Sequence, residues 1–334
     1  MSSIDDAVLK VLETAPARDE QSASAIRERA ADVLRPTGAL ARLDEVCAWL
    51  ASWQRTTKPA VMKPAVVVFV ADHGVTTEGV SAYPAEVTVA MLRALQEGVA
   101  TAAAMSRSVG AELRVVDVGV GVPTGNIAVE PAMSDDRFQA SFDVGRDAVA
   151  DLDCDLLIFG EMGIGNTTPA AAVAATLFGG PAEEWTGRGT GVDDETWSRK
   201  VAAVEAARAR IPADASPLEI LRQVGGAELA AIAGAMVEAR ARSIPVLLDG
   251  FVVTAAVAPL AVLHAGALDN AIAGHRSPEP GHGMLLDKLG LEPLLDLGMR
   301  LGEASGALAA LPIVRLAATV VVDVATFEEW GLTR

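Results

Sequence analysis

The stretch DLLIFGEMGIGNTTPAAAV, residues 155–173, decides the fold of this chain. An apolar run stops at Gly160, Glu161 follows, and glycines alternate with other residues through Gly165. The sequence Thr-Thr-Pro at 167–169 then opens an alanine-rich segment. Proline suits the first turn of a helix, and Asn or Thr before it suits the cap. The order predicts a buried strand, a glycine-rich loop and the start of a helix.

The glycine-rich loop is a candidate phosphate site. Glycines let backbone N–H groups approach a ligand closely, and the start of a helix adds partial positive charge. No lysine follows the last glycine as in a Walker loop, and the spacing misses the dinucleotide pattern G-x-G-x-x-G. A tight turn between strand and helix explains the loop equally well, so both interpretations stay open at this point.

Acids follow the other apolar runs of the chain in the same way. The runs VVVFVAD, LRVVD and IPVLLD end at Asp72, Asp117 and Asp249, as the first run ends at Glu161. The carboxyl ends of parallel strands meet at one edge of a sheet, and ligands bind at that edge in open α/β sheets. A single acid there is often only a loop cap, but four in the same position favour a functional site.

The spacing of these runs predicts the fold class. Alanine-rich segments between and after them predict helices at 85–110, 167–178, 195–210, 226–241 and 251–264. Alternating strands and helices predict an α/β fold, a doubly wound and mainly parallel sheet flanked by helices, with a smaller helical domain. The predicted parts are an N-terminal helical part of the small domain (1–60), an α/β nucleotide-binding domain (61–290) and a C-terminal helical part (291–334).

The composition limits the partners. The net charge of -17 argues against nucleic acid or an anionic membrane as the main partner. Cys47 and Cys154 are too few for a disulfide framework and suit a reducing cytoplasm. His275 and His282 lie seven residues apart across two prolines, which is no metal spacing, so we expect no metal. We also expect no membrane partner, because no apolar run approaches the length of a membrane span.

A second acid stands out near the C-terminus, in the sequence MRLGEASGA at 299–307. Glu303 lies there among small and apolar residues, and a helix running past Gly302 and Gly306 would be narrow on one side. A carboxylate in such surroundings tends to have a raised pKa and suits a general base. A buried glutamate paired with Arg300 is the structural alternative.

A further glycine-rich loop begins the stretch GRGTGVDDETWSRK, residues 187–200, which ends in a predicted helix. Arg199 and Lys200 are adjacent cations on that helix. In so acidic a chain they are a candidate phosphate clamp. An exposed helix face is an equally good interpretation of the pair.

Together these stretches resemble the nicotinate-nucleotide–dimethylbenzimidazole phosphoribosyltransferase family. The resemblance runs in order from about residue 30 to the C-terminus, and its parts are specific mainly in combination. They are RPTGALARLDEVCAWLA, VADHGVTTEGVSAYPAEVT, GNIAVEPAMS, GEMGIGNTTPAAA, VGGAELAAIAGAM, LLDGFVVTAAVA and GHRSPEPGHGMLLDKLGLEPLLDLGMRLGEASGA.

The resemblance implies a cytoplasmic homodimer that needs no cofactor. Its reaction moves 5-phosphoribose from nicotinate mononucleotide to 5,6-dimethylbenzimidazole with inversion at the anomeric carbon. The products are α-ribazole 5′-phosphate and nicotinate, in assembly of the lower loop of cobalamin. The leaving pyridinium nitrogen departs uncharged, so a single carboxylate that takes the proton of the benzimidazole is sufficient.

The resemblance also assigns site residues. The catalytic base falls on Glu303 and the second site glutamate on Glu161, while Lys200 and Ser277 hold the phosphate. The other substrate-binding positions are Asp72, Tyr83, Met91, Met162, Gly163, Gly165, Asp249 and Leu301.

Two of these positions depart from the family pattern. Tyr83 stands where some members carry serine, and Met91 where some carry glutamine, which implies a tighter or differently selective acceptor pocket. The segment between Val118 and Asn126 is also shorter than in the family pattern.

Two other classes of function stay open: another nucleotide-ribosyl hydrolase or transferase, and a non-catalytic nucleotide-binding module.

Overall fold

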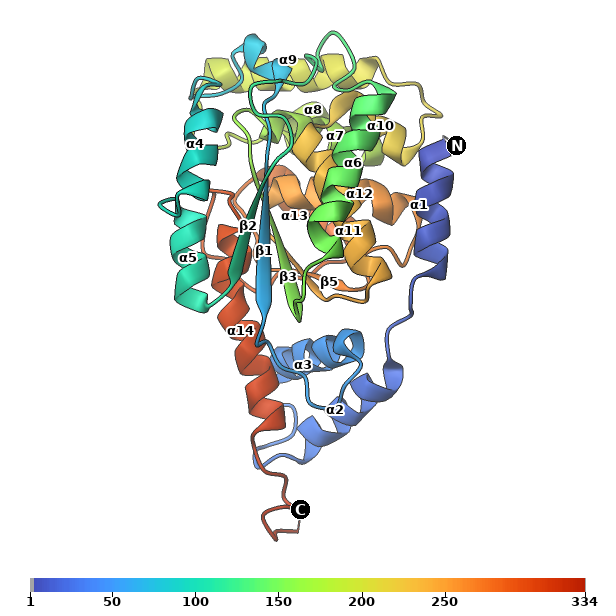
Figure 1. Cartoon of the computed structure of the whole chain (residues 1–334), viewed down its shortest axis with the longest axis vertical. Coiled ribbons are helices and arrows are strands. Elements are labelled where there is room, and N and C mark those ends of the chain that lie inside the picture. The colour runs from blue at the N-terminus through green and yellow to red at the C-terminus, as the bar shows by residue number, and fades with distance from the viewer. Residues whose placement is uncertain (1–2, 334) are drawn as a thin grey trace.

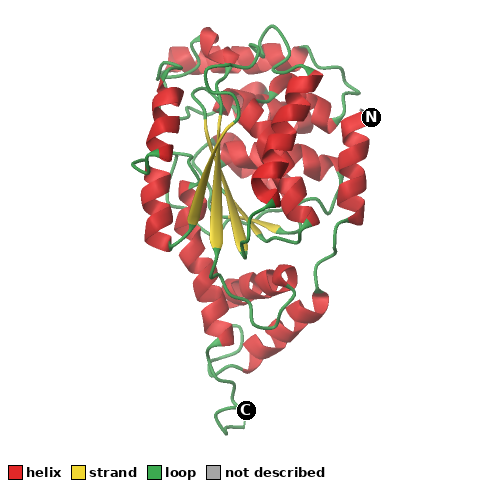
Figure 2. Cartoon of the chain, viewed as in Figure 1, coloured by secondary structure: helices red, strands yellow, loops and turns green. Residues whose placement is uncertain are grey.

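The computed structural model describes residues 3–333 of the chain. Among these residues lies a five-stranded parallel sheet with the strand order β2-β1-β3-β4-β5, drawn in yellow in Figure 2. The strands are β1 (Pro64–Val70), β2 (Glu112–Asp117), β3 (Leu156–Met162), β4 (Val246–Leu248) and β5 (Ala271–Ala273). The order reverses between β1 and β3, which makes that gap the topological switch point. The predicted parallel, doubly wound sheet is confirmed.

Both faces of the sheet are covered, as the continuous apolar run of β1 requires. Val67 and Phe69 face one buried cluster, whereas Val66 and Val68 face the other. The first face carries α6 (Asp135–Ala150), α7 (Thr167–Phe178), α10 (Pro217–Val224), α11 (Ala227–Ala241) and α12 (Phe251–Leu263). The second carries α3 (Ala41–Gln54), α4 (Val87–Gln96), α5 (Thr101–Val109) and α14 (Ser305–Val322).

Further helices extend these layers (Figure 1). The first layer continues into α8 (Ala182–Trp185), α9 (Asp194–Ala209) and α13 (Pro280–Leu289), and a short 3-10 helix, η1 (Gly74–Glu78), packs on α9. α1 (Ser3–Thr14) lies against α10 and α11.

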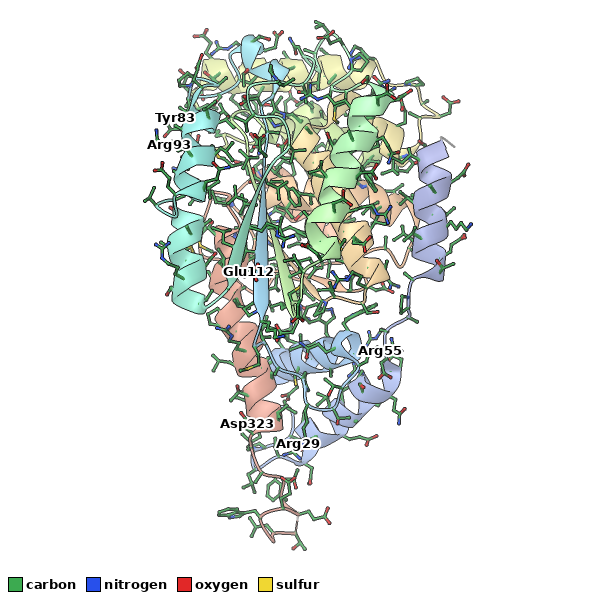
Figure 3. All side chains as sticks on the ribbon, viewed as in Figure 1. Arg29, Arg55, Tyr83, Arg93, Glu112 and Asp323 are labelled. Carbon is green, nitrogen blue, oxygen red and sulfur yellow. The ribbon has the colours of Figure 1, made fainter. Side chains whose placement is uncertain are left out.

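α2 (Glu20–Asp32) and α3 pack with the far end of α14 below the sheet, as Figure 1 shows. The Arg29 side chain donates hydrogen bonds to the carbonyl oxygens of Val321 and Val324, at and just after the end of α14. Arg29 and Asp323 accordingly appear together at the lower end of Figure 3. The division of the chain at 60 and 290 stays a prediction.

One predicted helix is wrong in a way that affects the site. The expected single helix at 85–110 is broken into α4 and α5, because Gly98 turns the chain with a φ of 75°. The break creates a second helix N-terminus, and Ala102 in its first turn is fully buried. β5 was not predicted at all, since its Ala-Ile-Ala sequence is too short to form a recognisable apolar run.

α14 corrects another expectation. Within residues 3–333, it is the one helix long and apolar enough to cross a membrane by length and composition. The expectation that no apolar run approaches a span is therefore wrong for this segment. Leu308, Leu311 and Val314 are nevertheless fully buried in the second core cluster. A core helix of a globular protein passes the same test of length and composition.

Candidate active site

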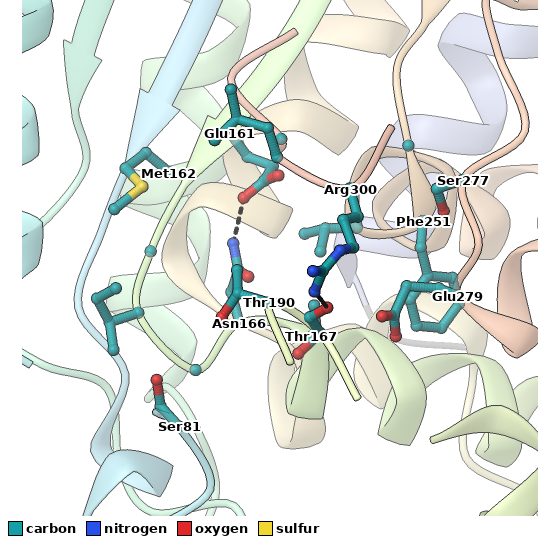
Figure 4. Close-up of a pocket in the computed structure, with 18 of the residues that line it drawn as sticks. Ser81, Glu161, Met162, Asn166, Thr167, Thr190, Phe251, Ser277, Glu279 and Arg300 are labelled. Carbon is teal, nitrogen blue, oxygen red and sulfur yellow. Dashed lines mark hydrogen bonds between the residues drawn. The ribbon is translucent and has the colours of Figure 1, made fainter. Parts of the chain in front are cut away.

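A cavity of about 410 Å³ opens at the carboxyl edge of the sheet (Figure 4). Its walls come from the loop after β1, the glycine-rich loop after β3, the ends of β4 and β5, and the segment that precedes α14. It lies beside the switch point between β1 and β3, where ligands of doubly wound sheets bind. Its volume lies in the range of small-molecule sites, about 300–1,000 Å³.

The structure brings the predicted site residues together, with one exception. Those that line the cavity are Tyr83, Met91, Glu161, Met162, Gly163, Gly165, Lys200, Asp249, Ser277, Leu301 and Glu303. The exception is Asp72.

The four strand-end acids divide into two pairs. Asp72 accepts a hydrogen bond from the Gly121 N–H at 2.7 Å, and Asp117 accepts from Gly119 N–H at 2.9 Å. Both therefore cap the loop beside the edge strand β2 and lie outside the cavity lining. The cavity sits over β3 and β4 instead, so Glu161 and Asp249 reach it.

Glu303 lies in a turn before α14 and is 2% exposed. The predicted helix past Gly302 is wrong, because Gly302, Glu303 and Ala304 all have positive φ and α14 begins at Ser305. Oε2 of Glu303 accepts a hydrogen bond from the backbone N–H of Ala102 in the first turn of α5, at 3.2 Å. The proposed pair with Arg300 is therefore replaced by a bond to a helix N-terminus.

The environment of Glu303 sets its proton affinity. Burial raises the pKa of its carboxyl group, the Ala102 N–H lowers it, and the charge of Asp249 raises it further, with a raised pKa as the result. A carboxylate with a raised pKa is a stronger base than an exposed one and is suited to accept a proton.

Small residues surround Glu303 because β3 passes directly against its turn. A Cβ on Gly160 would lie 2.5 Å from the backbone nitrogen of Ala304. A Cβ on Gly302 would lie 2.6 Å from Oε1 of Glu161. Residues 302–304 form a turn and not the narrow side of a helix, and what packs against this turn is the strand that carries Glu161.

Asp249 anchors the same turn from β4. Its Oδ1 accepts a hydrogen bond from the Ala307 N–H, at 3.0 Å, in the first turn of α14. Because α14 has no side-chain cap of its own, Asp249 supplies one from the sheet. His275 Nε2 lies 3.7 Å from that oxygen. Burial raises the pKa of Asp249, and His275 opposes the shift.

Glu161 stands at the end of β3. The side-chain amide of Asn166 donates a hydrogen bond to its Oε2, drawn as a dashed line in Figure 4. Burial raises the pKa of Glu161 to about 8, and the nearby acids Glu228, Asp249 and Glu303 add to the shift. The carboxyl group is therefore mostly protonated at neutral pH in the free protein. The Asn166 side chain therefore bonds Glu161 and makes no side-chain capping hydrogen bond on α7.

Lys200 lines the opposite wall and is 2% exposed. Its Nζ donates to Thr167 Oγ1 at 3.0 Å and to the Gly187 carbonyl oxygen at 2.9 Å. Burial lowers the pKa of the ammonium group, and Glu279 opposes that shift. Arg199 does not join it, since it donates to the Gly79 carbonyl oxygen and pairs with a glutamate on its own helix.

Ser277 is oriented by a buried histidine. Its backbone N–H donates to Nδ1 of His282 at 3.0 Å, and its Oγ lies 2.9 Å from the same nitrogen. Burial lowers the pKa of His282 to about 3, so the ring is neutral. His282 therefore orients Ser277 through these two contacts.

Among residues 3–333 no group of three or more His, Cys, Asp or Glu could hold a metal ion.

The third wall of the cavity is apolar. Tyr83, Met91, Met162 and Leu301 contribute to it. Tyr83 is 52% exposed, so its ring stands at the opening of the cavity. A flat hydrophobic molecule matches this wall better than a charged one.

Sequence reasoning missed several cavity residues. The sequence pattern indicates only a helix cap at Asn166 and does not mark Arg188, Glu279 or Phe251, although all of them line the cavity. Arg300, considered only as a partner of Glu303, reaches into the cavity beside Thr190 in Figure 4. Glu279 was present in the motif GHRSPEPGHG, and its position two residues after Ser277 was the available signal.

Groups with perturbed pKa values gathered in a concave site mark a candidate catalytic site. The fold and the site together define an α/β enzyme that acts on a small molecule with an anionic group.

Comparison with known proteins gives the family. A family model described as phosphoribosyltransferase matches residues 15–332. A nicotinate-nucleotide–dimethylbenzimidazole phosphoribosyltransferase of Mesorhizobium japonicum is 52% identical over 95% of both chains. One of the same name from Methylorubrum extorquens is 46% identical over 98% of this chain and 96% of its own.

Comparison with solved structures leads to the same family. The crystal structure of CobT from Thermus thermophilus superposes with a TM-score of 0.90 at 41% identity, covering 94% of this chain and 99% of that one. The chain belongs to the nicotinate-nucleotide–dimethylbenzimidazole phosphoribosyltransferase family.

Proposed function

We propose that this protein transfers 5-phosphoribose from nicotinate mononucleotide to 5,6-dimethylbenzimidazole, giving α-ribazole 5′-phosphate and nicotinate in cobalamin lower-loop assembly. The observation that carries the proposal is the placement of Glu303 and Glu161 on one wall of a cavity whose other walls hold Lys200 and an apolar patch. The names of the relatives specify both substrates.

The walls suggest where each part of the substrates binds. Lys200 and Ser277 hold the 5′-phosphate, together with the glycine-rich loop from Gly163 to Gly165. In that loop the Ile164 N–H already donates to Thr88 Oγ1 at 3.2 Å, so other N–H groups must serve the phosphate. The benzimidazole lies against the apolar wall, made of Tyr83, Met91, Met162 and Leu301.

Glu303 acts as the general base. One nitrogen of the benzimidazole attacks the anomeric carbon, and the other nitrogen loses its proton to the Glu303 carboxylate. Nicotinate leaves with the electron pair of the broken bond, and its ring nitrogen becomes uncharged. No general acid is needed for that departure. General-base catalysis of this kind contributes about 10²–10⁴-fold.

Glu161 stabilises positive charge at the sugar. In the free protein its carboxyl group keeps a proton, because burial raises its pKa to about 8. A bound pyridinium brings a positive charge beside it, which favours the ionised form. The carboxylate then faces the oxocarbenium character that develops at the anomeric carbon, an electrostatic contribution without proton transfer.

We also propose a cytoplasmic homodimer. The two cysteines, Cys47 and Cys154, are both free, which suits a reducing compartment. Leu297, which is 65% exposed in the segment before α14, supports an apolar contact with a second copy. Light scattering of the purified chain tests the assembly, and a monomer at micromolar concentration would contradict it.

The activity is tested by incubating the protein with nicotinate mononucleotide and a panel of acceptor bases, with products identified by mass. The expected result is α-ribazole 5′-phosphate and nicotinate in equal amounts. Ribose 5-phosphate formed without an acceptor would indicate a hydrolase. Nucleotide binding without turnover for any acceptor would indicate a non-catalytic module.

A further inference from the structure

One acid stands among the groups assigned to the phosphate. Glu279 occupies the N-cap position of α13 and is 9% exposed, yet its side chain makes no capping hydrogen bond to that helix. It lines the cavity together with Lys200 and Ser277 instead, and Figure 4 shows it on the same side of the cavity as Phe251 and Ser277. Its side chain faces the site and is not used by the helix that it begins.

The loop at 187–191 holds the Glu279 carboxyl group in place. The backbone N–H of Gly189 donates to it. Its Oε2 is buried and has no hydrogen-bond partner among the described residues. A Cβ on Gly187 would lie 2.0 Å from that oxygen, so only glycine leaves room for the carboxyl group there. The acid is a fixed part of the cavity wall.

The charged groups around Glu279 come from three elements. Lys200 on α9 and Arg300 in the segment before α14 both favour its ionised form, while burial disfavours it. Arg188, in the loop itself, pairs with Asp194, and His282 on α13 is neutral. Burial is the largest effect, and the pKa of Glu279 is raised as the net result.

Lys200 keeps one N–H donor for a ligand. An ammonium group has three N–H donors, and two of them are used on Thr167 and Gly187. The third is available to a phosphate. A phosphate ester carries close to two negative charges at neutral pH, because its second pKa is about 6. An ionised Glu279 at the same place would repel it, since like charges in a partly dry site disfavour one another.

We propose that Glu279 is the counter-ion of Lys200 in the free protein and takes up one proton from solvent when the 5′-phosphate binds. Its carboxyl group then donates a hydrogen bond to the phosphate, and Lys200 directs its third N–H donor to the same phosphate. The inference rests on the proposed function, which places the phosphate at Lys200 and Ser277. Nucleotide binding is therefore linked to proton uptake at this end of the cavity.

Calorimetry of the full chain tests this proposal. Binding of nicotinate mononucleotide is measured at pH 8 in two buffers of different ionisation enthalpy, and nicotinate riboside, which lacks the phosphate, is measured in parallel. Both ligands carry the pyridinium, so any proton change at Glu161 cancels in the comparison. The nucleotide is expected to take up about one proton more than the riboside, and its affinity to fall as the pH rises, by up to about tenfold per pH unit.

Glu279→Gln identifies the group that takes the proton. Glutamine keeps the size of the side chain but does not titrate, so the extra proton uptake should disappear and the affinity for the nucleotide should become nearly independent of pH. Glu195→Gln on α9, an exposed acid that does not line the cavity, is the matched control and should behave as the parent.

Two results would overturn the proposal. One is equal proton uptake by the parent and Glu279→Gln, which places the proton on the phosphate itself. The other is equal uptake for nucleotide and riboside in the parent, a result that needs no variant and stands even if Glu279→Gln fails to fold. Failure of the proposed function looks different, because the parent then neither binds nicotinate mononucleotide nor transfers its ribose.

Discussion

The backbone N–H of Glu303 donates a hydrogen bond to the backbone carbonyl oxygen of Glu161, at 3.1 Å. The two acids lie 142 positions apart in the sequence (303 minus 161), and this bond fixes one directly beside the other. It joins the turn before α14 to the end of β3. The position of the proposed base therefore depends on the close approach of these two backbone segments.

Gly160→Ala is expected to impair catalysis through that approach. The new Cβ would lie 2.5 Å from the backbone nitrogen of Ala304, and backbone cannot move aside as a flexible side chain can. A displacement of the Glu303 turn by about 1 Å should lower kcat by about 10²-fold. Overpacking should also destabilise the fold by about 1–3 kcal/mol. Both are measured by steady-state kinetics and thermal unfolding.

The matched control for that change is Gly283→Ala on α13, where a new Cβ meets no atom within 4 Å. Its kcat should equal that of the parent. A Gly160→Ala protein that keeps the parental kcat would show that the Glu303 turn tolerates displacement.

Lys200→Met is expected to weaken binding of nicotinate mononucleotide. The change removes a buried ammonium group that donates to Thr167 Oγ1 and keeps a donor for the phosphate. A hydrogen bond to a charged group is worth about 1.5–3 kcal/mol. The loss corresponds to roughly 10- to 150-fold in affinity. Titration of the nucleotide measures it, with the exposed Lys288→Met as control. Unchanged affinity in Lys200→Met would remove this residue from the phosphate site.

Tyr83→Ser is expected to change the preference among acceptor bases. The ring stands at the opening of the cavity beside Met91, and stacking on a flat heterocycle contributes about 0.5–1.5 kcal/mol. Relative rates for benzimidazoles of different bulk should shift by about threefold to tenfold, while nucleotide affinity stays the same. Tyr83→Phe keeps the ring and should retain the parental order. Identical relative rates in all three proteins would make Tyr83 a purely structural residue.

The sequence predicts those helices and strands whose hydrophobic pattern extends over many residues. The apolar runs of β1 and β3 and the helix after Gly165 are all found where expected. β5 was missed because three residues carry no pattern. The break between α4 and α5 was also missed, since the surrounding helical propensity masks a single glycine at position 98.

The site is predicted less completely, because chemistry depends on which groups face each other. Asp72 and Asp249 both follow an apolar run in the sequence. Because of the strand order, Asp72 bonds the loop beside β2, whereas Asp249 lies at the cavity. Glu303 was identified correctly as lying among small residues, whereas its turn conformation depends on contact with β3. Glu279 was overlooked because an acid before a proline looks like an ordinary helix cap.

Glu303 is expected to be the general base, and pH dependence follows from that role. Only the ionised carboxylate accepts a proton, and burial raises the pKa of this group. Activity should therefore fall as pH drops through that raised pKa, at a higher pH than for an exposed glutamate. In Glu303→Gln this acidic limb of the pH–rate profile should be absent from the residual activity.

The single most direct measurement is the turnover rate of Glu303→Gln with nicotinate mononucleotide and 5,6-dimethylbenzimidazole, beside the exposed control Glu13→Gln. A glutamine oxygen still accepts the hydrogen bond that Ala102 donates to Glu303, so the turn should stay in place. We expect both substrates to bind with parental affinity and turnover to fall by about 10²–10⁴-fold. A folded Glu303→Gln protein that binds both substrates and turns over at the parental rate would contradict the assignment and leave Glu161 as the remaining candidate for the base.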